Sequence, residues 1–269
     1  MASARDPGTS EVGVTAAMRT TASTRDFTDR AIDDATLERI LDAARFAPSG
    51  GNRQPWTVLV IRDPEVRTRL GALAQAGWNE YVGYLGAGLV PFAVGEDGVW
   101  PDPPVIDLAA AGANHAPNPL LDGITEAPAV LVVLADLTQL AVLDGGLDRH
   151  SIVGGASVYP FVQNVMLAAR AEGLGGVMTT FLCRREPEAR DLLGFPRHVG
   201  VAEHVGDHDA EEARRPVDHQ PHLTAGLPRV RVLRGLQQTE ERLAVGFEGV
   251  QRERVTVADE REPTGGVGR

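Results

Sequence analysis

One short segment decides the fold, and it runs Ala47-Pro48-Ser49-Gly50-Gly51-Asn52-Arg53-Gln54-Pro55-Trp56. Its prolines and adjacent glycines predict a loop over residues 49–55. An amphipathic helix is predicted before the loop, over residues 31–46, and it ends ahead of Pro48 because the residue before a proline disfavours helical geometry. After the loop, the β-forming residues 56–61 predict a buried strand. The segment is therefore a helix–loop–strand connection.

The rest of the chain continues this alternation of helices and strands. A helix is expected to open at Asp63-Pro64, and the richly apolar stretch 153–172 predicts a long helix ended by Gly173. The other expected elements are a strand at 130–134, a strand at 177–181, a short helix at 187–193 and a last strand at 198–205. The Gly-, Pro- and Asp-rich stretch 95–123 is a long excursion of the kind that forms lids or binding loops.

Three regions are expected along the chain. Residues 1–16 are small and polar and predict a disordered leader, whereas residues 17–206 carry the regular pattern of one domain. Residues 207–269 form an atypical polar segment without sustained periodicity, which is expected to be disordered unless it packs on something else.

Composition narrows the class of protein. The net charge of −11 argues against a nucleic-acid partner, and the chain contains no lysine, so an anion site must use arginine, histidine, hydroxyls or backbone amides. Cys183 is the only cysteine, which excludes a disulfide within one chain. The longest apolar run, 127–135, is too short to cross a bilayer. We therefore expect a soluble, cytoplasmic protein with no membrane partner.

Two loops offer ligand-binding chemistry. Ser23 and Arg25 place a hydroxyl and a guanidinium two residues apart, which suits a phosphate or the polar edge of a flavin. The loop 49–52 offers backbone amides and two glycines, so a planar ligand could approach it closely. The helix between them would bring both loops to one end. On spacing alone, a solvated strand end and an ordinary turn remain the alternative.

These motifs together resemble a known family. Ser-x-Arg-x-Phe at 23–27, the short helix, and Pro-Ser-x-x-Asn-x-Gln-Pro-Trp at 48–56 are similar to the N-terminal signature of the nitroreductase family of FMN-dependent oxidoreductases. The run 154–176 resembles the family's central helix and the glycine turn after it. The resemblance implies an α+β fold: a homodimeric three-layer α/β/α sandwich with a mixed, largely antiparallel sheet of four or five strands. It places the central helix at the dimer interface.

The resemblance also implies an FMN site. Arg25 would lie near the phosphate or the N1/O2 edge of the flavin, and Ser23 near the phosphate. Family members usually carry a basic residue at the place of Thr21 or Ala22, which this chain lacks; Arg19 is a nearby substitute. Arg214 and Arg215 are a remnant of the family's basic pair that reaches the phosphate. The full set of implied FMN-binding residues is Thr21, Ala22, Ser23, Arg25, Pro48, Ser49, Gly50, Asn52, Gln54, Gly175, Gly176, Arg214 and Arg215. Of these, Pro48, Ser49, Gly50 and Asn52 would come from the partner subunit.

The function implied by the resemblance is hydride transfer from NAD(P)H through FMN to a small electrophilic acceptor, such as a nitroaromatic or a quinone. No catalytic residue is assigned, because solvent can protonate the product. Trp78, Tyr81 and Tyr84 are expected to pack in the core, and Cys183 receives no catalytic role.

Two other readings stay open. One is a catalytically impaired, flavin-binding relative whose C-terminal phosphate site is degraded. The other is a metal-binding protein that uses His204, Asp207, His208, Asp209, His219 and His222, where histidines four and three residues apart would suit a helix. We expect no metal.

Overall fold

The computed structural model describes residues 12–209 and 231–234, and their centre is an antiparallel sheet. The strand order is β3-β4-β2-β1-β5, and every ladder between named strands is antiparallel. The only parallel pairing recorded among these residues is an isolated bridge between Ser23 and Gly176. The strands are β1 (Trp56–Val60), β2 (Ala129–Asp136), β3 (Leu174–Thr179), β4 (Val199–Asp209) and β5 (Arg231–Arg234). The α+β class with an antiparallel sheet is confirmed.

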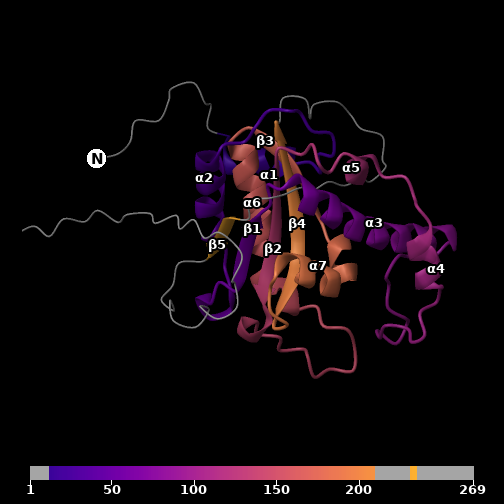
Figure 1. Cartoon of the computed structure of the whole chain (residues 1–269). Helices are drawn as coiled ribbons and strands as arrows, with labels where there is room; N and C mark the ends of the chain where they lie inside the picture. The colour runs from indigo at the N-terminus through magenta and orange to yellow at the C-terminus, as the bar shows by residue number, and fades with distance from the viewer. Residues whose placement is uncertain (1–11, 210–230, 235–269) are drawn as a thin grey trace, which may run out of the picture.

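Helices cover both faces of this sheet (Figure 1). On one face lie α1 (Val14–Thr20), α2 (Asp34–Ala44) and α6 (Tyr159–Ala171). On the other lie α3 (Pro64–Gly86), α5 (Pro119–Asp122) and α7 (Glu186–Leu193), while α4 (Leu108–Ala113) packs on α3. The arrangement is a three-layer sandwich within the described residues.

The alternation of side chains along β2 explains why there are two cores. Leu131 and Val133 belong to the core beneath α2 and α6, whereas Val130 and Val132 belong to the core beneath α3, α5 and α7. Successive side chains of a strand point to opposite faces, so a continuously apolar strand is stable only when both faces are covered. The buried run at 129–135 therefore requires the third layer.

Several boundaries differ from the sequence predictions. The helix expected from Val153 begins only at Tyr159; residues 154–157 form a 3₁₀ turn, η3 (Gly154–Ser157), and Pro160 lies in the first turn, where its missing N–H costs nothing. Residues 14–16, assigned to the leader, belong to α1. The strand predicted at 198–205 is not the last one. Strand β5 follows it, within the segment 207–269 described above as atypical, and pairs with β1.

The predicted helix end at Gly173 is confirmed, but the next strand begins at Leu174 instead of residue 177. Gly173, with a φ of 82°, makes the turn, and Gly175 and Gly176 lie inside β3.

Most of the excursion expected over 95–123 is irregular, with only α4 and α5 as short helices. No helix among the described residues combines the length and apolar character that a membrane crossing needs.

Candidate functional site

The first element of the site is the junction between the N-terminal segment and the sheet edge. Ser23 bridges Gly176 of β3, and the backbone N–H of Thr24 donates to the carbonyl oxygen of Gly176 at 2.9 Å. The hydroxyl of Thr24 is buried without a hydrogen-bond partner among the described residues. Two segments to which the family resemblance assigns FMN contacts are thus in direct contact.

Arg25 extends from this junction. Its Nη1 donates to the carbonyl oxygen of Ser23 at 3.2 Å. Desolvation by burial lowers the pKa of the Arg25 guanidinium from its ordinary value, yet arginine stays charged at neutral pH because that ordinary value is so high. A partly desolvated, positively charged group is therefore available for an anionic or electron-rich partner.

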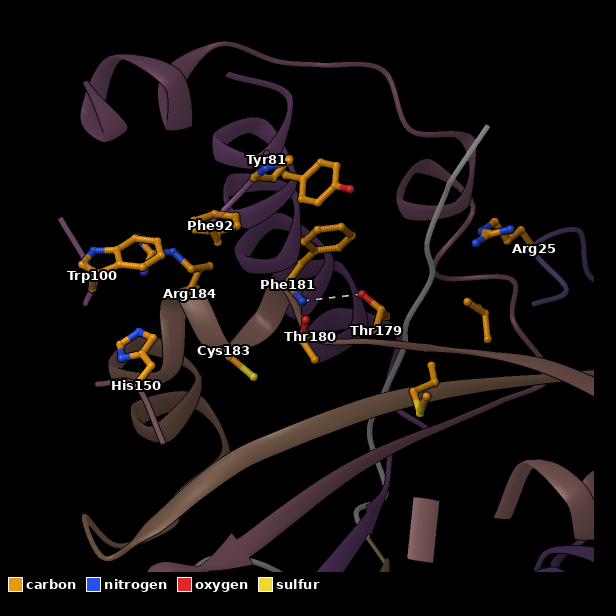
Figure 2. Close-up of a pocket in the computed structure, with 13 residues that line it drawn as sticks. Arg25, Tyr81, Phe92, Trp100, His150, Thr179, Thr180, Phe181, Cys183 and Arg184 are labelled. Atoms are coloured by element: carbon orange, nitrogen blue, oxygen red, sulfur yellow. Dashed lines mark hydrogen bonds between the residues drawn. The ribbon is translucent and has the colours of Figure 1, made fainter. Parts of the chain in front are cut away.

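Arg25 opens onto a pocket of about 770 Å³. Such a volume lies in the range of small-molecule and cofactor sites. Figure 2 shows Arg25 on one side of the pocket and Arg184 and Trp100 on the other, with Thr179 and Thr180 between them. The lining residues are Arg25, Tyr81, Pro91, Phe92, Trp100, His150, Val177, Met178, Thr179, Thr180, Phe181, Cys183 and Arg184.

A row of rings forms the far wall of the pocket. Phe92 stacks on Trp100 with ring centroids 6.0 Å apart, and Trp100 stacks on His150 at 6.2 Å. Phe92 has a positive φ of 54°, which is uncommon for a residue with a side chain. The amide of His150 donates to the carbonyl oxygen of Gly98 at 2.9 Å, so two long loops are joined at this wall.

A buried carboxylate supports the same wall from behind. Glu80 of α3 is 2% exposed and pairs through Oε2 with Arg184 Nε and through Oε1 with Arg185 Nη2, both at 2.7 Å. Both arginines belong to η4 (Phe181–Arg185), a 3₁₀ turn after β3. The Arg184 guanidinium also lies 5.0 Å from the centroid of the Phe92 ring. Glu80 therefore holds η4, and with it Arg184, against α3.

The loop 48–54 is not part of this pocket. Ser49 Oγ accepts from the amide of Gln54 at 3.0 Å, and the amide of Gly50 donates to Ser157 Oγ of η3 at 3.0 Å. Gly51, Asn52 and Gln54 all have positive φ. Within the described part of the chain, no residue of 48–54 lines the pocket. A single protomer therefore does not bring this loop to Arg25, and its contribution across a dimer stays a prediction.

Other predicted site residues have mixed outcomes. Arg214 and Arg215 lie outside the described residues. Trp78 and Tyr84 are buried as expected, whereas Tyr81 lines the pocket. Cys183 also lines it, and its Sγ donates to the carbonyl oxygen of Val201 at 3.1 Å.

Several pocket residues were not predicted at all. Trp100 lies in the excursion that we expected to form a lid or binding loop, which was the only signal for it. Nothing in the sequence marked Phe92 or His150, and no binding role was assigned to Arg184, because the contacts that bring these residues together join distant segments. Arg170 was also missed: its Nε donates to Thr20 Oγ1 at 2.9 Å, next to the predicted FMN segment.

The proposed metal ligands are not arranged as the sequence suggested. His204, Asp207, His208 and Asp209 lie in strand β4 instead of a helix. Four residues along a strand span roughly 13 Å, so His204 and His208 are not brought together by their spacing. Among the described residues there is no cluster of three or more groups able to hold a metal. His219 and His222 lie outside those residues.

Comparison with known proteins establishes the class of this chain. The sequence profile of the nitroreductase family matches residues 18–207. A protein of Archaeoglobus fulgidus, provisionally named an NADH dehydrogenase/NAD(P)H nitroreductase, is 47% identical over 191 residues, which cover 66% of this chain and 75% of that protein. The FMN reductase [NAD(P)H] of Bacillus subtilis is 25% identical over 74% of this chain and 69% of its own length.

The fold comparison agrees with the sequence comparison. The structure of B. megaterium NfrA2 superposes with a TM-score of 0.52 at 20% identity, covering 77% of this chain and 70% of that one. The fold is the α+β architecture with an antiparallel sheet, and the family match with its sequence relatives gives the class as an NAD(P)H nitroreductase-like oxidoreductase. The chain belongs to the nitroreductase family.

Proposed function

We propose that this chain is an FMN-dependent oxidoreductase that passes hydride from NAD(P)H through bound flavin to a small electrophilic acceptor, such as a nitroaromatic or a quinone. The observation that carries the proposal is the Thr24–Gly176 hydrogen bond, since it places Arg25 beside β3 at a pocket of cofactor size. Members of the nitroreductase family bind FMN, and relatives are named for NAD(P)H activity.

The residues at the junction fit the polar edge of a flavin. Arg25 supplies positive charge, Ser23 supplies an exposed hydroxyl, and the buried hydroxyl of Thr24 lacks a partner among the described residues. Gly175 and Gly176 carry no side chains, so a planar ring can approach this edge of β3 closely. FMN, when bound, supplies the hydride chemistry, and the protein supplies binding, orientation and charge.

Arg25 would contribute charge where it is needed. A reduced flavin accumulates negative charge at its N1/O2 edge, and a fixed cation in a partly water-excluded site stabilises that charge more than water does. The Ser23 carbonyl oxygen holds the Arg25 side chain back against its own segment. The guanidinium is therefore positioned before a ligand arrives.

Arg170 is the candidate for the missing basic residue near Thr21 and Ala22. It lies in the last turn of α6 and contacts Thr20, whereas Arg19 is exposed on α1. We propose that Arg170 contributes to binding the FMN phosphate, together with the Ser23 hydroxyl. This assignment makes the C-terminal arginines 214 and 215 additional partners rather than the sole source of positive charge.

A homodimer is part of the proposal. The loop 48–54 is braced by η3 and does not reach the pocket of its own protomer. In a dimer, Pro48, Ser49, Gly50, Asn52 and Gln54 would complete the partner's flavin site. Sedimentation equilibrium of the purified chain tests this, and a monomer that binds FMN at full strength would contradict it.

The decisive experiment is the visible absorption spectrum of the purified protein, followed by anaerobic addition of NADPH and then NADH. A flavin spectrum that bleaches with either nucleotide, and recovers on adding a nitroaromatic or a quinone, supports the proposal. A protein that stays colourless after incubation with FMN would overturn it and favour the impaired relative.

A further inference from the structure

The pocket is positively charged at both of its ends. Arg25 lies at one side and Arg184 at the other (Figure 2), and no Asp or Glu among the described residues lines the space between them. The whole chain, by contrast, carries a net charge of −11. An isolated positive pocket in an acidic protein attracts anions locally and repels them elsewhere.

Arg184 is held by a hydrogen bond through Nε, which leaves its two terminal nitrogens available to a ligand. Only its Nε is bonded to Glu80, and neither terminal nitrogen has a recorded partner among the described residues. Glu80 shares its single negative charge between two arginines, so the group Glu80, Arg184 and Arg185 keeps one net positive charge. A guanidinium with two open terminal nitrogens is a bidentate donor for a carboxylate.

The surroundings of Arg184 are aromatic. Phe92 lies beneath its guanidinium at 5.0 Å, and Tyr81, Trp100 and Phe181 complete the uncharged wall. Such a wall favours the flat, apolar body of an aromatic ligand, while a guanidinium at its end favours a negative group on that body.

We propose that the Arg184 end of the pocket binds the carboxylate of a planar aromatic acceptor and so selects acidic aromatics over neutral ones. The identification of this ligand as the acceptor rests on the proposed function, which assigns the Arg25 end to the flavin. Arg184 is the specificity-determining residue, and Glu80 is the positioning residue that orients it through the Nε hydrogen bond.

Binding can be measured without turnover. Trp100 lies in the pocket, so quenching of tryptophan fluorescence reports binding of 4-nitrobenzoate and of its neutral counterpart 4-nitrobenzamide. In the wild-type chain the benzoate binds more tightly. Arg184→Gln lowers the ratio of benzoate to benzamide affinity by roughly 10- to 100-fold, since a hydrogen bond to a charged group is lost. Arg69→Gln, an exposed arginine of α3 outside the pocket, leaves the ratio unchanged.

A second variant separates charge from folding. Arg184→Lys keeps the charge but loses the bidentate geometry, and its affinity ratio falls between those of the wild type and Arg184→Gln. Thermal melting identifies any variant that fails to fold. If Arg184→Gln does not fold, the affinity ratio of Arg184→Lys tests the proposal. An affinity ratio near one in the wild type, or a ratio unaffected by both substitutions, overturns the proposal.

The phosphates of NAD(P)H are the other source of anionic groups, and half-reactions distinguish them. Stopped-flow measurements follow flavin reduction by NADPH and flavin reoxidation by 4-nitrobenzoate separately. The proposal expects Arg184→Gln to slow reoxidation by 4-nitrobenzoate relative to 4-nitrobenzamide. Slower reduction by NADPH with unchanged reoxidation would assign the site to the nucleotide and overturn the proposal. If the protein binds no flavin, the proposed function fails, but the fluorescence titration still decides the anion site.

Discussion

The backbone N–H of Thr24 donates to the carbonyl oxygen of Gly176 at 2.9 Å, and this bond attaches the N-terminal segment to the edge of β3. Ser23 and Arg25 flank the bond, so their positions depend on the sheet rather than on the segment's own propensity. A ligand that rests on this edge is therefore met by groups from both ends of the domain.

Replacing Arg25 should release the flavin. Arg25→Ala removes the cation that lines the pocket at this edge, and the loss of one charge-assisted hydrogen bond costs about 1.5–3 kcal/mol, or roughly 10- to 100-fold in FMN affinity. The measurement is the dissociation constant from quenching of FMN fluorescence. Arg69→Ala is the matched control. Full flavin occupancy in Arg25→Ala would show that Arg25 does not bind the flavin.

Replacing Arg170 should discriminate between FMN and riboflavin. If Arg170 binds the phosphate, Arg170→Ala weakens FMN by about tenfold or more and leaves riboflavin affinity nearly unchanged, because riboflavin has no phosphate. Titration of both flavins against the same variant measures the difference. An equal loss for the two ligands would mean that Arg170 acts only by holding Thr20 at the end of α1.

Two glycines of α3 should respond oppositely to alanine. A Cβ on Gly77 would collide with the carbonyl oxygen of Phe181 and lie 3.3 Å from Arg184 Cβ, so Gly77→Ala pushes η4 away and costs about 1–3 kcal/mol of unfolding free energy. Gly86 has open space around it, and Gly86→Ala should be neutral or stabilising by up to about 1 kcal/mol. Urea denaturation measures both. Equal effects would show that η4 does not depend on this close approach.

Asp144 should make the stability of the loop before η3 depend on pH. The Ser151 hydroxyl, the Ile152 amide and Arg149 all bond this carboxylate and hold the pKa of Asp144 well below its ordinary value. A lowered folded pKa contributes stability above the unfolded value of about 3.9, and that contribution is lost as pH falls toward the folded pKa.

Hydrogen exchange at the Ile152 amide is the direct measurement, because this amide donates to Asp144 Oδ2 at 2.8 Å. Its protection factor should fall between about pH 5 and pH 2 in the wild type. In Asp144→Asn protection should be lower at neutral pH and independent of pH over this range. The exposed Asp148 supplies the control, and Asp148→Asn should behave like the wild type. A pH-independent wild type would contradict the assignment.

Elements with a strong local signal were predicted closely. The helix expected over 31–46 is α2, capped by the Asp33 side chain on the amide of Thr36, and the strand expected at 56–61 is β1. Capping, apolar periodicity and proline placement act within a few residues, so they can be recognised without the rest of the molecule. Strand β5 was missed, because its pairing with β1 joins distant residues and its own four-residue pattern is short.

The features of the site also divide into those that the sequence indicated and those that only the structure brought together. The types of group that could hold a flavin, Ser23 and Arg25 with the glycines of β3, were recognisable as motifs. The bridge that joins them was not, and neither was the aromatic wall, where Phe92 and Trp100 come from one loop and His150 from another. Helical spacing predicted that Trp78, Tyr81 and Tyr84 all pack in the core, and it did not single out Tyr81, which lines the pocket.

The amino-acid sequence by itself determined the family, the alternation of helices and strands, and the chemical types available for binding. These depend on local propensity and on motif spacing along the chain. Only the tertiary structure decided that Arg25 and Arg184 share one pocket, that Glu80 is buried beneath two arginines, and that the loop 48–54 does not line that pocket. The physical reason is that packing and burial bring together residues far apart in the chain, and no local pattern encodes which distant partners will meet.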